Sequence, residues 1–191
     1  MSEAQSAMPG AAFEGAHTVR ETGLCGMITL RGDLGASAMA EAVRDAAGTA
    51  VPGRREIVHE GASSVAWMSP DELLVMTEYA RVPEALAAIG AALKGAHHLA
   101  VDVSDARAMF EVTGKPGAVR EAIAKLCPVD MGHDAFAPGQ IRRTRMGQVA
   151  AAFWMVDEGT IRVVCFRSVA EYVFGLLRDA GLPGGEVGLF G

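Results

Sequence analysis

The sequence has few cysteines and no long hydrophobic run. Its three cysteines, Cys25, Cys127 and Cys165, show no C-x-x-C spacing and are odd in number. They suggest neither a disulfide framework nor a thiolate zinc site, and we expect reduced thiols in a cytoplasmic protein. No apolar run approaches the ~18 residues that a membrane-spanning helix needs, and the N-terminus lacks the pattern of a signal peptide. No membrane association is expected.

Positive charge is also scarce. Lysine and arginine number 17 against 23 acidic residues, which gives a formal net charge of -6. Nucleic acids and anionic membranes bind to concentrated cationic faces, so neither is expected as a partner. Half of the 191 residues are hydrophobic, enough to bury a sizeable core. The composition therefore predicts a folded, weakly acidic protein.

The middle of the chain predicts two successive units with the order β-α-β-β-α. In the first unit, we expect a strand, a helix, two hairpin strands and a helix at 25–31, 37–47, 65–69, 73–77 and 82–93. In the second, the same elements are expected at 108–113, 119–126, 149–156, 161–166 and 168–180. A capping box of Ser168 and Glu171 is expected to begin the last helix.

The two units also resemble each other in sequence, which predicts an internal duplication. Residues 27–32 (MITLRG) parallel residues 109–114 (MFEVTG), and each segment leads into an alanine-rich helix. The two tryptophans, Trp67 and Trp154, are predicted to lie at equivalent points, each before a hairpin and a helix. The expected fold class is α+β, with two pseudo-repeated β-α-β-β-α units, antiparallel or mixed sheets, and one shared core.

The two ends of the chain lack apolar periodicity. Residues 1–24 predict a flexible N-terminal tail and residues 181–191 a glycine-rich C-terminal tail. Such tails can be disordered or can become ordered across a partner, and disorder is the favoured interpretation. The organised part, 25–180, is expected to be a single domain with half-repeats at about 25–100 and 101–180.

The sequence shows no recognisable catalytic, cofactor-binding or metal-binding motif. Gly32 and Gly35 lack the third glycine of a dinucleotide fingerprint, and neither a Walker motif nor a G-x-S-x-G elbow occurs. The adjacent His97 and His98 would diverge on a strand or a helix, and His133 is interpreted as a polar loop residue. We therefore expect no catalytic residue, no bound cofactor and no metal.

Two groups of charged residues have alternative interpretations. Arg142, Arg143 and Arg145 form a dense cationic cluster in this acidic chain. Three arginines can bind a phosphate or a polyglutamate, or pair with acids across a protein interface, and we favour the interface. Asp102 and Asp105 can form a carboxylate pair, but local hydrogen bonding in a turn is the favoured interpretation.

Five short segments carry a resemblance to a known family. They are LRGDL at 30–34, WMSPDELLV at 67–75, DVSDAR at 102–107, VTG at 112–114 and LCPVD at 126–130. As a set they resemble the gamma subunit family of heterotetrameric sarcosine oxidase, with similarity from about Met27 to Ala180. That family is similar in fold to the folate-binding part of glycine-cleavage aminomethyltransferase, so the resemblance implies an aminomethyltransferase folate-binding-domain-like fold.

The resemblance implies a non-catalytic accessory subunit. The complex of that family oxidatively demethylates sarcosine to glycine, with hydrogen peroxide and 5,10-methylenetetrahydrofolate as further products. FAD, FMN, NAD and tetrahydrofolate are expected on the partner alpha, beta and delta subunits, and the chain is expected to dock chiefly on the large folate-handling alpha subunit. The predicted contact residues, of types that interfaces favour, are Trp67, Pro70, Arg142, Arg143 and Arg145. For both tryptophans, a place in the core is the stronger expectation.

The alternative is a stand-alone folate-binding or aminomethyltransferase-like protein. The aminomethyltransferase pattern has acids that enter a strand after a glycine pair, whereas the matching segment here has Ala150, Ala151 and Ala152. Alanine can neither hold a pterin nor accept a proton, which disfavours a transferase. The Lys-Gly-Cys-Tyr motif of the related iron-sulfur maintenance proteins is also missing, because Cys127 lies in Leu-Cys-Pro.

Overall fold

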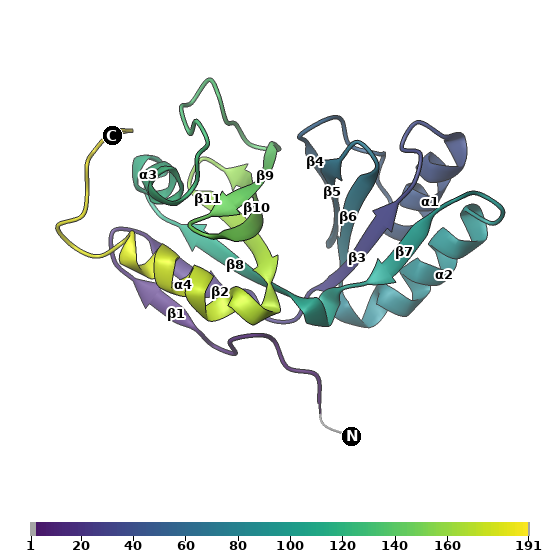
Figure 1. Ribbon diagram of the computed structural model, residues 1–191, viewed down its shortest axis with the longest axis horizontal. Helices are drawn as coiled ribbons and strands as arrows, with labels where there is room; N and C mark the ends of the chain where they lie inside the picture. Colours follow the sequence, from purple (N-terminus) through teal and green to yellow (C-terminus); the bar gives the residue numbers. More distant parts are fainter. Residues whose placement is uncertain (1–2, 191) are drawn as a thin grey trace. The chain divides into compact units, whose positions relative to one another are not determined.

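The computed structural model describes residues 3–190 and divides into two compact units (Figure 1). Unit 1 comprises Met1–Gly23 and Ala106–Gly191, and unit 2 comprises Leu24–Asp105. The division after residue 105 lies close to the expected half-repeat boundary. The N-terminal segment, however, belongs to the same unit as the C-terminal half.

Unit 2 is built on a five-stranded sheet with the order β4-β5-β6-β3-β7. Its elements are β3 (Gly26–Arg31), α1 (Ser37–Ala47), β4 (Ile57–Glu60), β5 (Ser63–Ser69), β6 (Glu72–Thr77), α2 (Val82–Ala92) and β7 (Leu99–Asp102). Every strand pair is antiparallel. Helices α1 and α2 cover one face of the sheet, where Ile28 and Leu30 pack against Met39, Val43 and Ile89.

Unit 1 is built on a six-stranded sheet with the order β1-β2-β8-β11-β10-β9, again antiparallel throughout. Its elements are β1 (Ala12–Glu14), β2 (Thr18–Glu21), β8 (Arg107–Thr113), α3 (Pro116–Leu126), β9 (Ile141–Met146), β10 (Val149–Asp157), β11 (Thr160–Phe166) and α4 (Ala170–Asp179). Phe110, Phe153 and Val163 of this sheet pack with Ile123 of α3 and Val173 of α4. Each unit thus has a core cluster of its own, rather than the one shared core expected from the sequence.

The strand pairings support the predicted duplication. In unit 2, β3 lies between β6 and β7, and β6 continues to β5 and β4. In unit 1, β8 lies between β11 and β2, and β11 continues to β10 and β9. The two sheets therefore match strand for strand, with β1 as an extra strand of unit 1. The expected α+β class is confirmed, with antiparallel sheets. The strands that the sequence did not predict are β4 and β7 in unit 2, and β1, β2 and β9 in unit 1.

The predicted equivalence of the two tryptophans is wrong by one residue. Trp67 lies opposite Leu73, directly before the bulge in the β5–β6 hairpin. Met155 lies opposite Ile161, directly before the matching bulge in the β10–β11 hairpin. Met155, and not Trp154, is therefore the counterpart of Trp67. A one-residue shift turns a side chain to the other face of a sheet, and Trp154 is only 1% exposed whereas Trp67 is half-buried.

The N-terminal region is more ordered than the sequence predicts. Strands β1 and β2 lie within the expected tail, and β2 pairs with β8 through four residues. Val19 is fully buried in the core of unit 1, and Phe13 packs against it. The expectation of a flexible tail is therefore wrong for residues 12–21. Strands of only three and four residues bury few side chains, so they leave little apolar periodicity in the sequence.

The predicted capping box is also wrong. A single 3-10 turn, Arg167–Val169, precedes α4, and no side chain caps the first turn of this helix. The buried side of α4 is carried by Ala170, Val173 and Leu177. Over residues 3–190, none of the helices combines the length and apolar content needed to cross a bilayer.

Candidate functional site

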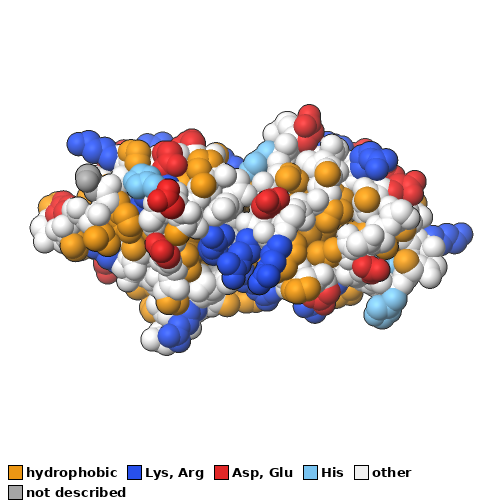
Figure 2. All heavy atoms as spheres, turned by 90° about the horizontal axis from the view of Figure 1, so that it is seen from above, with side chains coloured by type: hydrophobic (Ala, Val, Ile, Leu, Met, Phe, Trp, Pro, Cys, Tyr) orange, Lys and Arg blue, Asp and Glu red, His pale blue; other side chains and the backbone are white. Residues whose placement is uncertain are grey.

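The three predicted interface arginines lie on β9, which places them on two different faces of its sheet. Arg142 pairs across the sheet with Phe153, whose side chain is in the core, while Arg143 and Arg145 pair with Ala152 and Ala150. Since successive side chains of a strand point to opposite faces, Arg143 and Arg145 share one face and Arg142 lies on the other. The expected cluster is therefore a pair of exposed arginines and one half-buried arginine. Figure 2 shows acidic, basic and hydrophobic side chains interspersed over the face that it draws.

Arg142 is engaged within its own unit. Its guanidinium donates hydrogen bonds to the carbonyl oxygens of Ile141 (3.0 Å) and Ala135 (2.9 Å). It also donates to the Gln140 side chain at 3.1 Å and lies 5.0 Å from the centroid of the Phe136 ring. These contacts hold the segment before β9 and favour a structural role for Arg142.

A buried arginine that the sequence did not single out holds the same segment. Arg120 of α3 is 0% exposed and donates to the carbonyl oxygens of Met131 (2.7 Å) and Phe136 (2.9 Å). Its second terminal nitrogen lies 2.6 Å from the carboxylate of Glu158, whose side chain is 47% exposed. A charge can be buried in this way because carbonyls and a carboxylate surround it. We call Arg120, together with the Met131 and Phe136 carbonyls that it holds, the Arg120 clamp. A single arginine in a helix does not indicate such a contact in the sequence.

Trp67 and Pro70, the other two predicted contact residues, lie in unit 2. Trp67 is half-buried on β5, and Pro70 is exposed in the turn between β5 and β6. The hydroxyl of Ser69 donates to the Asp71 carboxylate at 2.6 Å, and Arg31 lies 3.8 Å from Asp71 and 3.0 Å from Glu72. The turn thus presents a proline beside a small network of charges, as expected of a turn at the surface.

The cysteines have the environment of structural thiols. Cys127 and Cys165 are buried, and burial raises the pKa of each thiol to about 12. Such thiols stay protonated near neutral pH and are poor nucleophiles. Cys25 is half-buried, with its sulfur 3.8 Å from the carbonyl oxygen of Thr77.

The histidines are dispersed. His98 bonds to the carbonyl of Ala96 in the loop before β7, and the Nδ1 atom of His133 lies 3.6 Å from the Glu158 carboxylate. His17 is buried beside β2, where its Nε2 donates to the Leu177 carbonyl at 2.9 Å, and burial lowers its pKa. Among residues 3–190, no three histidine, cysteine or acidic side chains come together as a metal-binding group.

Asp102 makes the local turn hydrogen bonds predicted from the sequence, whereas Asp105 bonds to a residue distant in the sequence. Asp102 accepts hydrogen bonds from the backbone N–H of Ser104 (2.9 Å) and from its hydroxyl (2.5 Å). The Ser104 hydroxyl in turn accepts the N–H of Met27 at 2.9 Å. Asp105 instead accepts from the Tyr79 hydroxyl at 3.1 Å. The two carboxylates therefore have separate partners and do not act as a carboxylate pair.

The C-terminal segment is held by two charged side chains of α3. The carboxylate of Glu121, which is 7% exposed, accepts the N–H groups of Val187 and Gly188 at 2.7 Å each. Lys125 lies 2.7 Å from the same carboxylate and donates to the Gly185 carbonyl at 2.8 Å. The Lys125 ammonium and the Val187 N–H lower the pKa of Glu121 to about 2. The expectation of a disordered C-terminal tail is therefore wrong for residues 185–188.

A cavity of ≈ 200 Å³ lies beneath this segment, within unit 1. Its lining includes His17, Lys115, Glu121, Lys125, Glu186 and Gly188. Two of its charged residues, Lys125 and Glu121, pair with each other, and Glu186 accepts the N–H of Gly184 at 2.8 Å.

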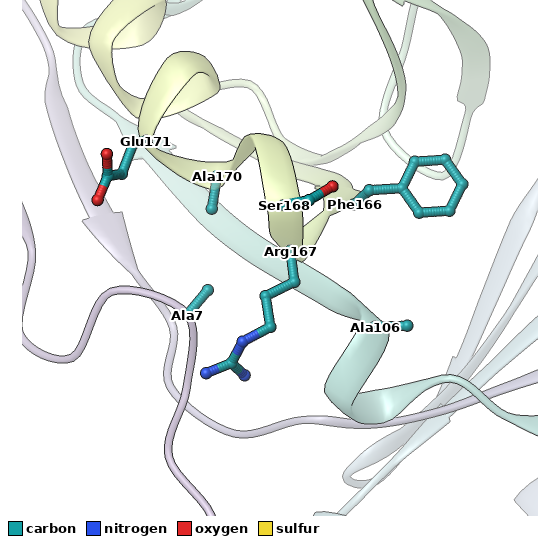
Figure 3. Close-up of a pocket in the computed structure, with 7 residues that line it drawn as sticks. All are labelled: Ala7, Ala106, Phe166, Arg167, Ser168, Ala170 and Glu171. Carbon is teal, nitrogen blue, oxygen red and sulfur yellow. The ribbon is translucent and has the colours of Figure 1, made fainter.

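A second hollow of unit 1 is lined in part by an arginine that bonds to the N-terminal segment. Figure 3 shows Arg167 pointing toward the segment that carries Ala7, whereas Phe166 points away from it. The Arg167 guanidinium donates to the carbonyl oxygens of Gln5 (2.9 Å) and Ser6 (3.0 Å). The segment at Gln5 and Ser6 is thereby joined to the 3-10 turn that precedes α4.

Comparison with known families decides the family of this chain. The sequence model of the sarcosine oxidase, gamma subunit family matches residues 31–182. The chain belongs to the sarcosine oxidase gamma subunit family. The resemblance predicted from the five short segments is therefore confirmed. The comparison with curated protein sequences gives no match.

Solved structures share the fold of this gamma-subunit family member. Heterotetrameric sarcosine oxidase from Corynebacterium sp. U-96, in complex with pyrrole 2-carboxylate, has 24% sequence identity and a TM-score of 0.79, covering 92% of this chain and 90% of that chain. Glycine cleavage system aminomethyltransferase T from Bartonella henselae has 11% identity and a TM-score of 0.57, covering 80% of this chain and 43% of that chain. At these identities the likeness shows the fold alone, and it confirms the predicted aminomethyltransferase-like fold.

Three alanines of β10 lie where the aminomethyltransferase sequence pattern has acidic residues. Ala150 is exposed near the start of β10, and Ala151 and Ala152 are buried within it. The strand is paired on both sides, with β9 and with β11. Methyl groups therefore occupy the strand entry at which the aminomethyltransferase sequence pattern has acids.

Proposed function

We propose that this chain is a non-catalytic accessory subunit of a heterotetrameric sarcosine oxidase. In the reaction of that assembly, sarcosine, O2 and tetrahydrofolate give glycine, hydrogen peroxide and 5,10-methylenetetrahydrofolate. The observation that carries the proposal is the match of residues 31–182 to the gamma-subunit family. The similarity in fold to a heterotetrameric sarcosine oxidase over 92% of the chain supports it.

The side chains of this protein support a non-catalytic role. Alanines 150–152 stand where acids would be needed for a folate-dependent transfer, and the buried thiols of Cys127 and Cys165 are held protonated. We therefore assign FAD, FMN, NAD and tetrahydrofolate to the partner subunits. A cytoplasmic location is proposed, in which the three free cysteines stay reduced.

The proposed partners are the alpha, beta and delta subunits, chiefly the large folate-handling alpha subunit. The proposed contacts are the exposed Arg143 and Arg145 on one face of β9, and Trp67 and Pro70 in the β5–β6 hairpin. Arginine and tryptophan are enriched at interfaces because they combine large contact area with specific polar atoms. Arg142 is retained as a proposed contact, although its guanidinium already supports the segment before β9.

The test is purification of the tagged chain from cells that express the whole oxidase. We expect larger, flavin-coloured subunits to copurify, with sarcosine-dependent production of hydrogen peroxide. The chain purified alone should be colourless and inactive. A chain that is recovered alone from such cells would contradict the proposal.

The alternative, a stand-alone folate-binding or aminomethyltransferase-like protein, is favoured by the shared fold with aminomethyltransferase T. Titration of the isolated chain with tetrahydrofolate, followed by calorimetry, separates the two functions. The accessory-subunit proposal predicts no saturable heat. Saturable binding by the isolated chain, together with the failure to copurify any partner, would favour the alternative.

A further inference from the structure

The outer edge of β7 differs from the corresponding edge of unit 1. Strand β7 pairs with β3, and among the described residues no strand pairs with its other side. Its counterpart β2 pairs with β8 on one side and with β1 on the other. The duplicated architecture therefore supplies a covering strand at one edge and leaves the equivalent edge open.

The hydrogen bonds show that β7 and β2 occupy the same register. The N–H of Val103 donates to the Met27 carbonyl at 2.8 Å, and the N–H of Thr22 donates to the Met109 carbonyl at 3.0 Å. Met27 and Met109 are counterparts in the duplicated strands β3 and β8. Strand β7 thus lies on its sheet as β2 lies on the other, residue for residue.

The register identifies the backbone groups that face outward. In an antiparallel pair, residues that bond to the partner strand alternate with residues whose N–H and C=O point away from it. Because Val103 bonds to β3, Val101 and Leu99 also bond to β3, and the backbone groups of Ala100 and Asp102 point outward.

The counterparts of these outward groups in unit 1 are bonded to β1. Val19 and Glu21 of β2 correspond to Ala100 and Asp102. The N–H of Glu21 donates to the Ala11 carbonyl at 3.0 Å, and Val19 lies opposite Phe13. Phe13 packs against the core of unit 1. Strand β1 is therefore an internal template for what can bind along β7.

The side chains of β7 are more apolar than those of its counterpart β2. Leu99 is 50% exposed and Val101 is 42% exposed, whereas their counterparts in β2 are the polar Thr18 and Arg20. Soluble proteins usually protect an open edge with charge or proline, because exposed apolar edge strands pair with other chains. On β7 the charge is limited to Asp102 at the end of the strand.

We propose that the outer edge of β7 binds an extended apolar segment of another subunit of the oxidase. The segment adds antiparallel to β7 as a sixth strand, as β1 does in unit 1, and bonds to the backbone groups of Ala100 and Asp102. One apolar side chain of this segment lies beside Ala100, as that of Phe13 lies beside Val19 in unit 1. The segment also covers Leu99 and Val101. Such strand addition is a common mode of peptide recognition. This inference rests on the proposed function as a subunit.

Hydrogen–deuterium exchange of the assembled oxidase and of the isolated chain tests the proposal. We expect the amides of Ala100 and Asp102 to exchange at least about tenfold more slowly in the complex, since each gains a backbone hydrogen bond. The amides of Val19 and Glu21, already bonded to β1, serve as the internal control and should change little. Unchanged exchange at Ala100 and Asp102 in an assembled complex would overturn the inference and leave the proposed function intact.

Substitutions provide the second arm. Ala100→Pro removes an outward N–H without removing a bond to β3, and Val101→Lys places a charge on the edge. Each substitution should lower the amount of the chain that is recovered with the complex by about tenfold or more. Val156→Lys, at a 37% exposed position of unit 1, is the matched control and should assemble as the parent does. Equal thermal midpoints would show that the variants fold.

The remaining outcomes are also decisive. If the parent chain does not assemble with any oxidase subunit, the proposed function fails and this inference fails with it. If both edge variants assemble as the parent does, strand addition is excluded. Protection of Ala100 in the isolated chain that rises with its concentration would mean that a second copy occupies the edge, which contradicts the choice of partner.

Discussion

The two units share a sheet order but differ in how the chain between the first helix and the next strand is held. In unit 2 this connection, residues 48–56, begins at Gly48, whose N–H donates to the Arg44 carbonyl and whose positive φ of 72° turns the chain away from the axis of α1. In unit 1 the connection, residues 127–140, is longer and is fixed by the buried guanidinium of Arg120. The duplicated topology therefore does not imply duplicated interactions.

The sheet edges differ in the same sense. Strand β1 covers the edge of unit 1, and the equivalent edge of unit 2 is open with apolar side chains exposed. Unit 1 also holds both ends of the described chain, through Arg167 and Glu121. The comparison teaches that unit 1 covers this sheet edge with a strand of its own, whereas unit 2 leaves the equivalent edge open, where we propose that a partner binds. The following experiments challenge this contrast.

The largest expected difference is between the two tryptophans. Trp154→Ala should lower the free energy of unfolding by about 4 kcal/mol, because the side chain is 1% exposed and its loss leaves a cavity. Trp67→Ala should cost about half as much, since that side chain is half-buried. Denaturant unfolding of both variants measures the difference. Equal losses would contradict the one-residue offset between the two hairpins.

The Arg120 clamp should have the next largest effect. Arg120→Met leaves the Met131 and Phe136 carbonyls without their donor and should destabilise the chain by about 3 kcal/mol. Arg162→Met, which removes a partly exposed ion pair with Glu111, is the control and should cost less than about 1 kcal/mol. Equilibrium unfolding in urea compares them. The clamp is refuted if the control is the more damaging substitution.

Much of the fold could be predicted from the sequence, and the missed elements share a physical cause. Helix α1 has the predicted bounds because Met39, Val43 and Ala46 repeat on one buried face. Strand β9 was missed because three arginines occupy its six residues and interrupt the apolar pattern. Edge strands bury one row of side chains at most, so backbone pairing, which sequence periodicity does not report, defines them.

The candidate contact residues were less predictable. The arginines near residue 142 stood out by composition, but their separation onto two faces depends on the unpredicted strand. The Arg120 clamp and the Glu121 anchor join segments far apart in the sequence, and a lone charged residue in a helix does not indicate its partner. Short motifs, by contrast, sufficed for the family.

The Glu121 carboxylate, which anchors the C-terminal segment at Val187 and Gly188, is expected to titrate at an unusually low pH. The folded pKa of Glu121, about 2, lies below its ordinary value of 4.5. Its contribution to stability is therefore fully present above pH 4.5 and is lost as the pH falls through about 2. A carbon-detected NMR titration of the carboxyl group should give a midpoint near 2, and a midpoint near 4.5 would remove the anchor from the account.

A substitution tests the same anchor at neutral pH. Glu121→Gln should speed amide exchange at Val187 and Gly188 by about tenfold, because the charge-assisted bonds are lost. Glu171→Gln, at an exposed position of α4, is the matched control and should leave both amides unchanged. Faster exchange in the control alone would contradict the assignment.

The smallest effect on stability is expected on β9. Arg145→Glu should change the free energy of unfolding by less than about 0.5 kcal/mol, since the side chain is exposed. It should nevertheless weaken assembly with the other subunits, most strongly at low salt. Size-exclusion chromatography of the coexpressed subunits at two salt concentrations measures this. Assembly that is insensitive to the substitution would remove Arg145 from the proposed contacts.

The central claim, an accessory subunit without chemistry of its own, is tested most directly by adding the purified chain back to oxidase subunits prepared without it. The account predicts that the chain alone produces no hydrogen peroxide from sarcosine and carries no flavin absorbance. It also predicts that the chain joins the other subunits in a stable complex with sarcosine-dependent peroxide production. Peroxide production or folate turnover by the isolated chain, or its failure to join the complex, would contradict the account.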